Sequence, residues 1–139
     1  DCNGTLERFT GDGMMVFLGD PEPMPDHPEQ AVRMAMRIRH AVADLRRQWA
    51  ARGFELKTGI GIASGVAALG TIGFEGRRDY AAIGTVTNLA ARICGQAEGE
   101  QILIDESTYK RLPAEIETRQ CGEIDLRGFS RLRTVHEVL

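Results

Sequence analysis

The sequence has 139 residues, of which 42% are hydrophobic and 27% charged, and its formal net charge is -3. This length and composition fit one globular domain, spanning residues 1–139, with a hydrophobic core of its own. The slightly acidic charge gives no electrostatic basis for non-specific nucleic-acid binding, so no nucleic-acid partner is expected.

Residues 6–18 contain two short apolar runs around Gly11-Asp12-Gly13. Strand-forming residues on both sides of a Gly/Asp turn predict a β-hairpin with Asp12 at its tip. Two interpretations of Asp12 stay open at this point. It is either a turn former or a carboxylate that projects beyond the sheet to bind a hard cation.

A proline-rich loop over residues 19–28 leads into an amphipathic helix predicted over residues 28–52. Its apolar stripe consists of Ala31, Ala35, Ile38, Val42, Leu45 and Trp49. We interpret the arginines on its other face as a solvated surface, with phosphate binding as the alternative.

Residues 56–64 alternate as a strand, with Gly59 and Gly61 on one face. A glycine face predicts that another backbone or a helix approaches closely there. Residues 66–72 are predicted to pair with this strand after a turn, and residues 73–80 to form a looser segment.

A second helix is predicted over residues 85–97, where Asn88 and Arg92 are close enough to act on one ligand. The remaining predicted elements are a strand over 101–104, a helix from a cap at Asp105 to Leu112, paired strands over 116–121 and 123–126, a basic loop over 127–133 and a strand over 134–139. The order β-β-α-β-β-α-β-α-β-β predicts an α+β sandwich on a mostly antiparallel sheet.

Three features predict a site for an anionic ligand. Asp12 offers oxygen to a metal, Asn88 and Arg92 offer an amide and a guanidinium, and Arg127 lies in a basic loop. Phosphoryl chemistry uses these residue types, because metals and arginine neutralise phosphate charge. A GxxxxGK[ST] loop is missing from the sequence, which argues against a Walker-type NTPase.

Four stretches, at residues 8–17, 59–65, 79–92 and 126–129, resemble the class III nucleotide cyclases (adenylate and guanylate cyclase catalytic domains) in order and spacing. The Asn-Leu-Ala-Ala-Arg helix motif is the most specific part. The resemblance implies a nucleotide cyclase sandwich related to the ferredoxin-like fold. It also implies attack of a ribose 3′-hydroxyl on the α-phosphate, which releases pyrophosphate and a 3′,5′-cyclic nucleotide in a signalling protein.

The resemblance also implies residue roles. Asp12 matches the second of two aspartates that bridge two magnesium or manganese ions. Asn88 matches the residue that orients the ribose, and Arg92 the residue that stabilises charge at the α-phosphate. Arg127 stands where the family usually has a lysine that binds the terminal phosphates, so the charge is kept and the geometry changes.

Two base-selecting positions depart from the family pattern. Arg8 replaces the lysine of adenylate cyclases or the glutamate of guanylate cyclases, and Ala81 replaces a hydrogen-bonding threonine or aspartate. Arg8 can donate a hydrogen bond as lysine does, which favours an adenylate cyclase acting on ATP. The alternatives are a guanylate cyclase and a non-catalytic, cyclase-like module for dimerisation or nucleotide binding.

The family's first metal aspartate lies on a strand before the hairpin, and Asp1 is too close to the hairpin to replace it. We therefore expect a domain that lacks its N-terminal strand and helices and is inactive alone. The family's shared site also implies a head-to-tail homodimer and an upstream sensor or regulatory domain.

Three cysteines without a CxxC pair, and the lack of a signal-peptide pattern, favour a reducing compartment. We therefore expect the domain to be cytoplasmic, with membrane attachment of the parent protein left open.

Overall fold

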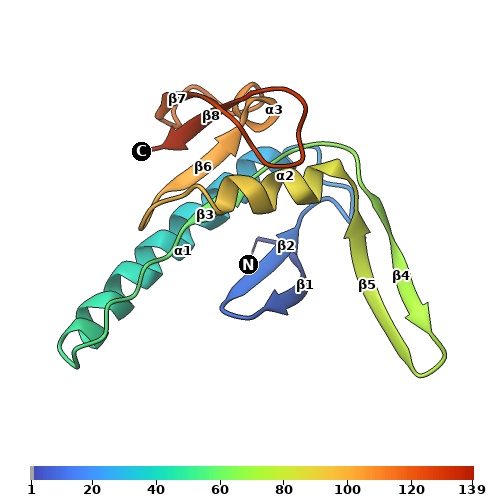
Figure 1. The fold of residues 1–139 in the computed structure, drawn as a ribbon, viewed down its shortest axis with the longest axis horizontal. Coiled ribbons are helices and arrows are strands. Elements are labelled where there is room, and N and C mark those ends of the chain that lie inside the picture. Colours follow the sequence, from blue (N-terminus) through green and yellow to red (C-terminus); the bar gives the residue numbers. More distant parts are fainter. Residues whose placement is uncertain (1) are drawn as a thin grey trace.

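Helices separate groups of strands along the chain in the computed structural model, which describes residues 2–139 except for the side chain of Arg77 (Figure 1). Within these residues the elements are β1 (Thr5–Thr10), β2 (Gly13–Phe17), α1 (His27–Ala50), β3 (Ile60–Ile62), β4 (Ala68–Phe74), β5 (Arg77–Ile83), α2 (Thr85–Cys94), β6 (Ile102–Asp105), α3 (Glu106–Tyr109), β7 (Thr118–Ile124) and β8 (Arg133–Val138). The predicted α+β class with mostly antiparallel pairing is confirmed. None of the helices in this part of the chain has the length and hydrophobicity needed to cross a membrane.

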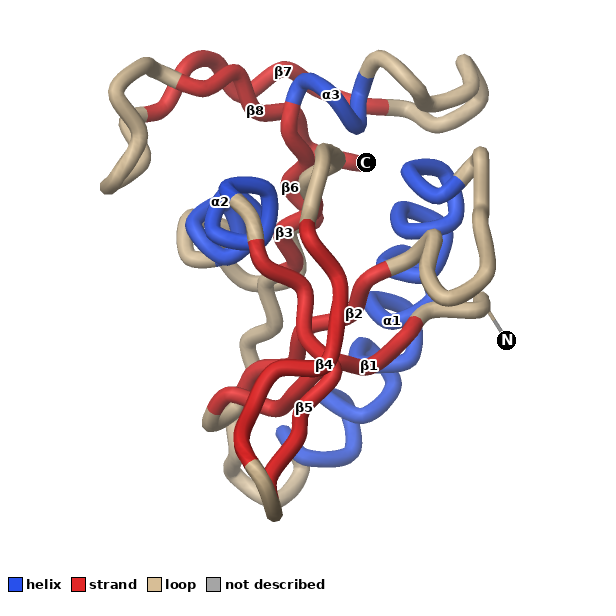
Figure 2. Tube along the Cα trace, turned by 90° about the vertical axis from the view of Figure 1, so that its right-hand side faces the viewer, coloured by secondary structure: helices blue, strands red, loops and turns tan. Residues whose placement is uncertain are grey.

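The central layer is a four-stranded sheet in the order β3-β6-β8-β7. β3 runs parallel to β6, whereas the β6–β8 and β8–β7 pairs are antiparallel. Every residue of β6 is buried because helices cover both faces of this strand. Ile102 and Ile104 pack with Val32 of α1, and Leu103 packs with Ile93 of α2. Figure 2 shows β3 and β6 between the two helices.

Gly61 explains how closely α2 approaches the sheet. A Cβ built on Gly61 would lie 2.5 Å from the carbonyl oxygen of Ala90 and closer still to the backbone nitrogen of Cys94. A Cβ on Gly59 would lie 2.7 Å from the carbonyl oxygen of Ala97. Both distances are shorter than real Cβ contacts, so the predicted approach of a helix to the glycine face is confirmed.

Gly61→Ala is expected to destabilise the fold by about 1–3 kcal/mol, because the methyl group meets backbone atoms that cannot rotate away. Gly70→Ala is the matched control: Gly70 also lies in a strand, and a Cβ there meets nothing within 4 Å. Urea unfolding of both variants measures the difference. Equal stability of the two variants would contradict the packing argument.

The strand pairings of residues 56–83 differ from the prediction. The strand expected over residues 56–64 is confined to β3, and it pairs with β6 rather than with residues 66–72. β4 instead pairs with β5 in a separate hairpin, from Ala68 opposite Ile83 to Phe74 opposite Arg77, where residues 73–80 were predicted to be loose. The physical reason is the turn at Gly76, whose positive φ of 94° permits a tight reversal. The observed order is β-β-α-β-β-β-α-β-α-β-β.

Three smaller predictions were also wrong. The helix capped by Asp105 ends at Tyr109 rather than Leu112. The two strands expected over residues 116–126 are one strand, β7, whose register shifts between Gln120 and Gly122. On α1 the predicted apolar stripe is correct at the buried Ala35, but it omits the buried Val32 and includes Leu45 and Trp49, which are 47% and 43% exposed. The C-terminal half of α1 extends beyond the sheet, which leaves its apolar stripe partly in solvent (Figure 1).

Candidate functional site

Asp12 lies in the two-residue turn between β1 and β2, which confirms the predicted hairpin. Gly11 has a φ of +62°, a conformation that glycine adopts without strain. Thr10 pairs directly with Gly13 across the turn, so the carboxylate of Asp12 is held at the exposed tip of the hairpin. Its oxygens are therefore accessible to a ligand.

Arg8 and Ala81 both line a cavity of about 640 Å³ between β1 and β5, which we call the β1–β5 cavity. The two positions that the sequence analysis assigned to base selection are thus brought together. Ala81 is 5% exposed and contributes only a methyl group. A hydrogen bond and the charge of Glu7 raise the pKa of the Arg8 guanidinium further above its ordinary value, so Arg8 remains a cationic donor.

Tyr80 also lines the β1–β5 cavity, and it is held in place by residues that do not line the cavity. Its hydroxyl donates a hydrogen bond to the carboxylate of Asp20 in the proline-rich loop. That bond, with burial as a secondary cause, raises the pKa of the Tyr80 phenol above its ordinary value. The ring of Phe17 lies 6.0 Å from the ring of Tyr80 and packs against it. The wall is therefore built by β2, β5 and the loop together.

Asn88 and Arg92 are exposed on α2, where they lie one helical turn apart. The helix is fixed by its opposite face, because Leu89 and Ile93 are buried against the sheet. Its first turn is closed by the hydroxyl of Thr87, which donates to the carbonyl of Gly84 at 2.7 Å. A rigid helix thus presents an amide and a guanidinium to solvent.

Arg127 is exposed in a loop that packs on the same core as α2. Leu126 is 1% exposed and Phe129 packs beside it, so the core holds both flanks of the loop. Between them, Gly128 has a φ of +92°, and the backbone N–H of Phe129 donates to the carbonyl of Leu126 at 3.0 Å. This turn holds the arginine outside the core.

The predicted site residues thus form two groups within one chain. Asp12, Arg8 and Ala81 belong to the hairpins, whereas Asn88, Arg92 and Arg127 lie on α2 and the loop beside it. Figures 1 and 2 both show the β1–β2 hairpin separate from α2. No hydrogen bond or ion pair among residues 2–139 joins Asp12 to Asn88 or Arg92. Asp1, which was judged above to be too close to the hairpin to replace the first metal aspartate, lies outside the described residues.

The described residues supply only part of the ligands that a divalent metal needs. Asp12 offers the hard oxygen that Mg²⁺ prefers, and Mg²⁺ sites often combine one or two carboxylates with substrate phosphates. Among the described residues, however, no three His, Cys, Asp or Glu side chains gather in a metal-binding arrangement. Asp12 therefore fits as one ligand of a metal–nucleotide complex and does not form a metal site by itself.

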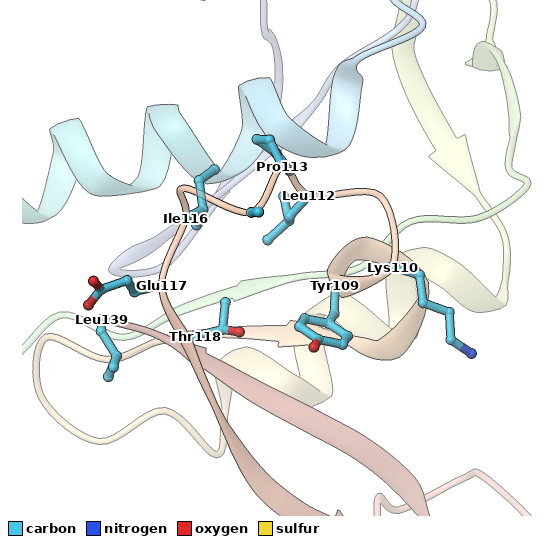
Figure 3. A pocket seen from close by; sticks show the side chains of 9 residues that line it. Tyr109, Lys110, Leu112, Pro113, Ile116, Glu117, Thr118 and Leu139 are labelled. Atoms are coloured by element: carbon cyan, nitrogen blue, oxygen red, sulfur yellow. The ribbon is translucent and has the colours of Figure 1, made fainter.

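A second cavity, of about 560 Å³, lies far from these residues in the fold and contains none of them. It is lined by the last residue of α3, by the chain from there to the first residue of β7, and by Leu139 after β8. Figure 3 shows Tyr109 and Lys110 on one side of it and Glu117 with Leu139 on the other. The sequence analysis assigned no chemistry to this region.

Next to this second cavity, the buried ring of His136 lies against Glu106 and Tyr109. His136 is 4% exposed, and its Nε2 lies 2.7 Å from a carboxylate oxygen of Glu106. The Tyr109 ring stacks on the imidazole at a centroid distance of 3.9 Å. The hydrogen bonds from His136 and then Lys110 lower the pKa of the Glu106 carboxyl below its ordinary value of 4.5.

Glu106→Gln is expected to remove a pH-dependent part of the stability. A lowered folded-state pKa means that the ionised carboxylate stabilises the fold above pH 4.5, and that this contribution is lost as the pH falls through the lowered pKa. The variant should therefore have a lower Tm than the wild type at about pH 5.5, with the difference shrinking in stronger acid. Thermal unfolding across this range measures it, with exposed Glu75→Gln as control. A Tm difference independent of pH would contradict the assignment.

Comparison with solved structures identifies the class to which this fold belongs. The chain superposes on the crystal structure of the adenylyl cyclase CyaB from P. aeruginosa with a TM-score of 0.92 and 35% identity, covering 99% of this chain and 72% of that one. It superposes on the crystal structure of a guanylyl cyclase with a TM-score of 0.89 and 28% identity, covering 99% and 70%. The fold is that of a class III nucleotide cyclase domain.

Sequence comparison leads to the same class. The family described as "Adenylate and Guanylate cyclase catalytic domain" matches residues 8–137, and the chain belongs to this family. It is 29% identical over 127 residues to an adenylate cyclase of Mycobacterium tuberculosis, covering 91% of this chain and 28% of that protein. It is 26% identical over 140 residues to adenylate cyclase 1 of Rhizobium meliloti, covering 99% and 21%. The chain thus spans less than a third of these relatives.

Sequence reasoning missed Glu7, which lines the β1–β5 cavity with a buried side chain. A strand with regular alternation places neighbouring residues on opposite faces. The register of β1 shifts between Leu6 and Arg8, which breaks this alternation at Glu7. Nothing in the local residue pattern marks that irregularity. Asp79 and Tyr80 were missed as wall residues because residues 73–80 were not predicted to form a strand.

Proposed function

We propose that residues 1–139 form the catalytic domain of an adenylate cyclase, which converts ATP into 3′,5′-cyclic AMP and pyrophosphate in a cytoplasmic signalling protein. The observation that carries this proposal is the exposed Asn88/Arg92 pair on α2 of a cyclase fold. The 35% identity to an adenylyl cyclase and the adenylate cyclase names of the relatives support ATP over GTP.

The residues of α2 act at the reacting centre. The 3′-hydroxyl of the ribose loses its proton to solvent water as its oxygen bonds to the α-phosphorus. The bond from the α-phosphorus to the β-phosphate oxygen breaks, and pyrophosphate leaves. Asn88 orients the ribose through its amide, which can donate and accept hydrogen bonds. Arg92 donates to the α-phosphate oxygens as their charge redistributes in the transition state. Arg127 binds the terminal phosphates from its exposed loop.

The hairpin residues bind the other parts of the nucleotide. Arg8 and Ala81 contact the base in the β1–β5 cavity, and Asp12 holds a divalent metal at the tip of the β1–β2 hairpin. Two Mg²⁺ or Mn²⁺ ions, when bound with ATP, neutralise phosphate charge and activate the attacking hydroxyl. Because Asp12 supplies only one carboxylate, the complete pair of ions needs a further ligand from elsewhere in the protein.

A head-to-tail homodimer brings Asp12 of one copy to Asn88 and Arg92 of the other and completes two equivalent sites. Two observations support it. The two groups of site residues lie apart within one chain, and the hairpins expose large apolar side chains. Phe9 and Phe74 are 71% and 73% exposed, and Ile83 is 57% exposed. Apolar patches of this kind mark interaction surfaces. An upstream sensor domain that rotates the two copies would control the site.

The test uses the protein at its natural length with Mn²⁺ and measures cyclic nucleotide formed from ATP and from GTP. Formation of more cyclic AMP from ATP than cyclic GMP from GTP supports the proposal. A preference for GTP would instead favour the guanylate cyclase that the 28% identity to a guanylyl cyclase keeps as second candidate. Nucleotide binding without either product would identify a non-catalytic module and overturn the enzyme assignment.

A further inference from the structure

Glu7, in the β1–β5 cavity, has a buried carboxylate of which only one oxygen accepts hydrogen bonds. The side chain is 1% exposed and lines the cavity. It lies where the register shifts between the pairs Leu6↔Val16 and Arg8↔Met15. Irregularities of this kind change the direction in which a side chain points, and they are frequent next to active sites.

The two carboxylate oxygens of Glu7 have different surroundings. Oε1 accepts hydrogen bonds from Nε and Nη2 of Arg8, at 3.1 and 2.5 Å. Oε2 is buried and has no hydrogen-bond partner among the described residues. A buried acceptor without a partner is destabilising, and native proteins keep few of them. Glu7 therefore has one acceptor oxygen that no described residue uses, next to a guanidinium that donates.

The other residues that line the cavity restrict which kinds of ligand can bind there. Phe9, Phe74 and Ile83 provide apolar surface, and Ala81 has no side-chain hydrogen-bonding group. Asp79 and Tyr80 complete the lining with a second carboxylate and a phenol ring. A flat heterocycle fits such walls when one of its edges carries an N–H donor beside an acceptor. Adenine has this edge, with its exocyclic amino group beside the ring nitrogen N1. Guanine has N1–H beside the acceptor O6 on that edge, but its amino group is a second donor. That group would find no acceptor on Glu7, because Arg8 already occupies the other carboxylate oxygen.

We propose that Glu7 is a specificity-determining residue that recognises adenine. Its Oε2 accepts a hydrogen bond from the exocyclic amino group, and Arg8 donates to the adjacent ring nitrogen. This inference rests on the proposed function, because it takes a nucleotide as the ligand of the domain. It also accounts for Ala81: the acceptor missing from that position is supplied by Glu7 across the cavity.

The test measures equilibrium binding of two nucleotides that cannot cyclise, with Mn²⁺ and the protein at its natural length. These are 3′-deoxy-ATP and the triphosphate of 3′-deoxypurine riboside, which lacks the amino group. A hydrogen bond to a charged acceptor corresponds to a preference of about tenfold or more for 3′-deoxy-ATP in the wild type. In Glu7→Ala we expect the preference to fall to about threefold or less.

Glu7→Gln provides a second variant of nearly equal volume. Its amide oxygen remains bonded to Arg8, which turns the NH₂ group toward the cavity, so the preference should be lost here too. Exposed Glu22→Ala is the matched control and should keep the wild-type preference. Circular dichroism and Tm establish that each variant is folded. Glu7→Gln keeps the hydrogen bonds of Oε1 to Arg8 and should have a Tm close to that of the wild type, whereas Glu7→Ala also loses those bonds and should have a lower Tm.

Several outcomes would overturn the role of Glu7. They are equal affinity of the wild type for both nucleotides, an unchanged preference in both Glu7 variants, tighter binding of 3′-deoxy-GTP than of 3′-deoxy-ATP, and no binding of any nucleotide. A different set of results would refute the proposed function. A wild type that shows the preference, loses it in the variants and forms no cyclic nucleotide from ATP would support Glu7 and refute the enzymatic activity.

Discussion

Arg92→Ala is expected to lower cyclic AMP formation by a factor on the order of 10²–10³, through kcat rather than through KM. The proposed role of Arg92 is to meet charge that develops on the α-phosphate oxygens in the transition state, and removing one such donor has effects of this size. Arg92 is exposed on α2, so stability should change little. The measurement is steady-state kinetics with ATP and Mn²⁺.

Two further variants make this expectation sharper. Arg92→Lys keeps the charge and loses the planar donor geometry, so it should recover only part of the activity. Arg52→Ala removes an exposed arginine beyond the end of α1 and should leave kcat unchanged. Wild-type kcat in Arg92→Ala would refute the transition-state role, and a change confined to KM would reassign the residue to ground-state binding.

The elements predicted best from the sequence are those that local chemistry determines. The Gly11-Asp12 turn produced the β1–β2 hairpin, and the apolar stripe with Leu89 and Ile93 produced α2. The glycine at position 61 also indicated the close approach of a helix, because only a missing side chain permits it. Each of these features depends on a few neighbouring residues, so a local pattern is sufficient to predict it.

Strand pairing was predicted less well because it depends on distant residues. β3 pairs with β6, which lies forty-two positions further along the chain at Ile60↔Ile102. The alternation over residues 56–64 specifies two faces and does not specify a neighbour. The choice is made by α1 and α2, which bury opposite faces of β6 and leave room for β3 at its edge. The β4–β5 hairpin is then free to project from the sheet (Figure 1).

The residues of the candidate site also fall into two groups: those that were predicted from local motifs and one that was not. Asp12, Asn88 and Arg92 were found because they belong to short motifs with fixed spacing. Glu7 was not found, because its burial depends on a register shift in β1 and on β5 packing across the cavity. A residue whose position depends on an irregularity of the backbone leaves no mark in the periodic pattern of the sequence. It is identified only from the three-dimensional structure.

Asp12→Asn is expected to reduce kcat/KM by roughly a thousandfold, since a metal that loses its carboxylate ligand forfeits several kcal/mol of charge stabilisation. Asparagine retains the size and the turn preference of aspartate, so the β1–β2 hairpin should stay intact. The Mn²⁺ concentration that gives half-maximal activity should rise in the variant, and a metal titration of activity measures it. Asp44→Asn, which removes an exposed carboxylate from α1, should leave the titration unchanged.

This titration decides between the two interpretations of Asp12 that the sequence left open. If Asp12 only forms the turn, asparagine at the same position keeps both the activity and the response to Mn²⁺. If Asp12 is a metal ligand, removing its charge weakens the response even though the hairpin is preserved.

Mixing the Asp12→Asn variant with the Arg92→Ala variant tests the proposed head-to-tail homodimer. Each variant should be nearly inactive alone, and the mixture should regain part of the activity, because heterodimers contain one site with neither substitution. No recovery in a mixture that forms heterodimers would place both residues in a site within one chain.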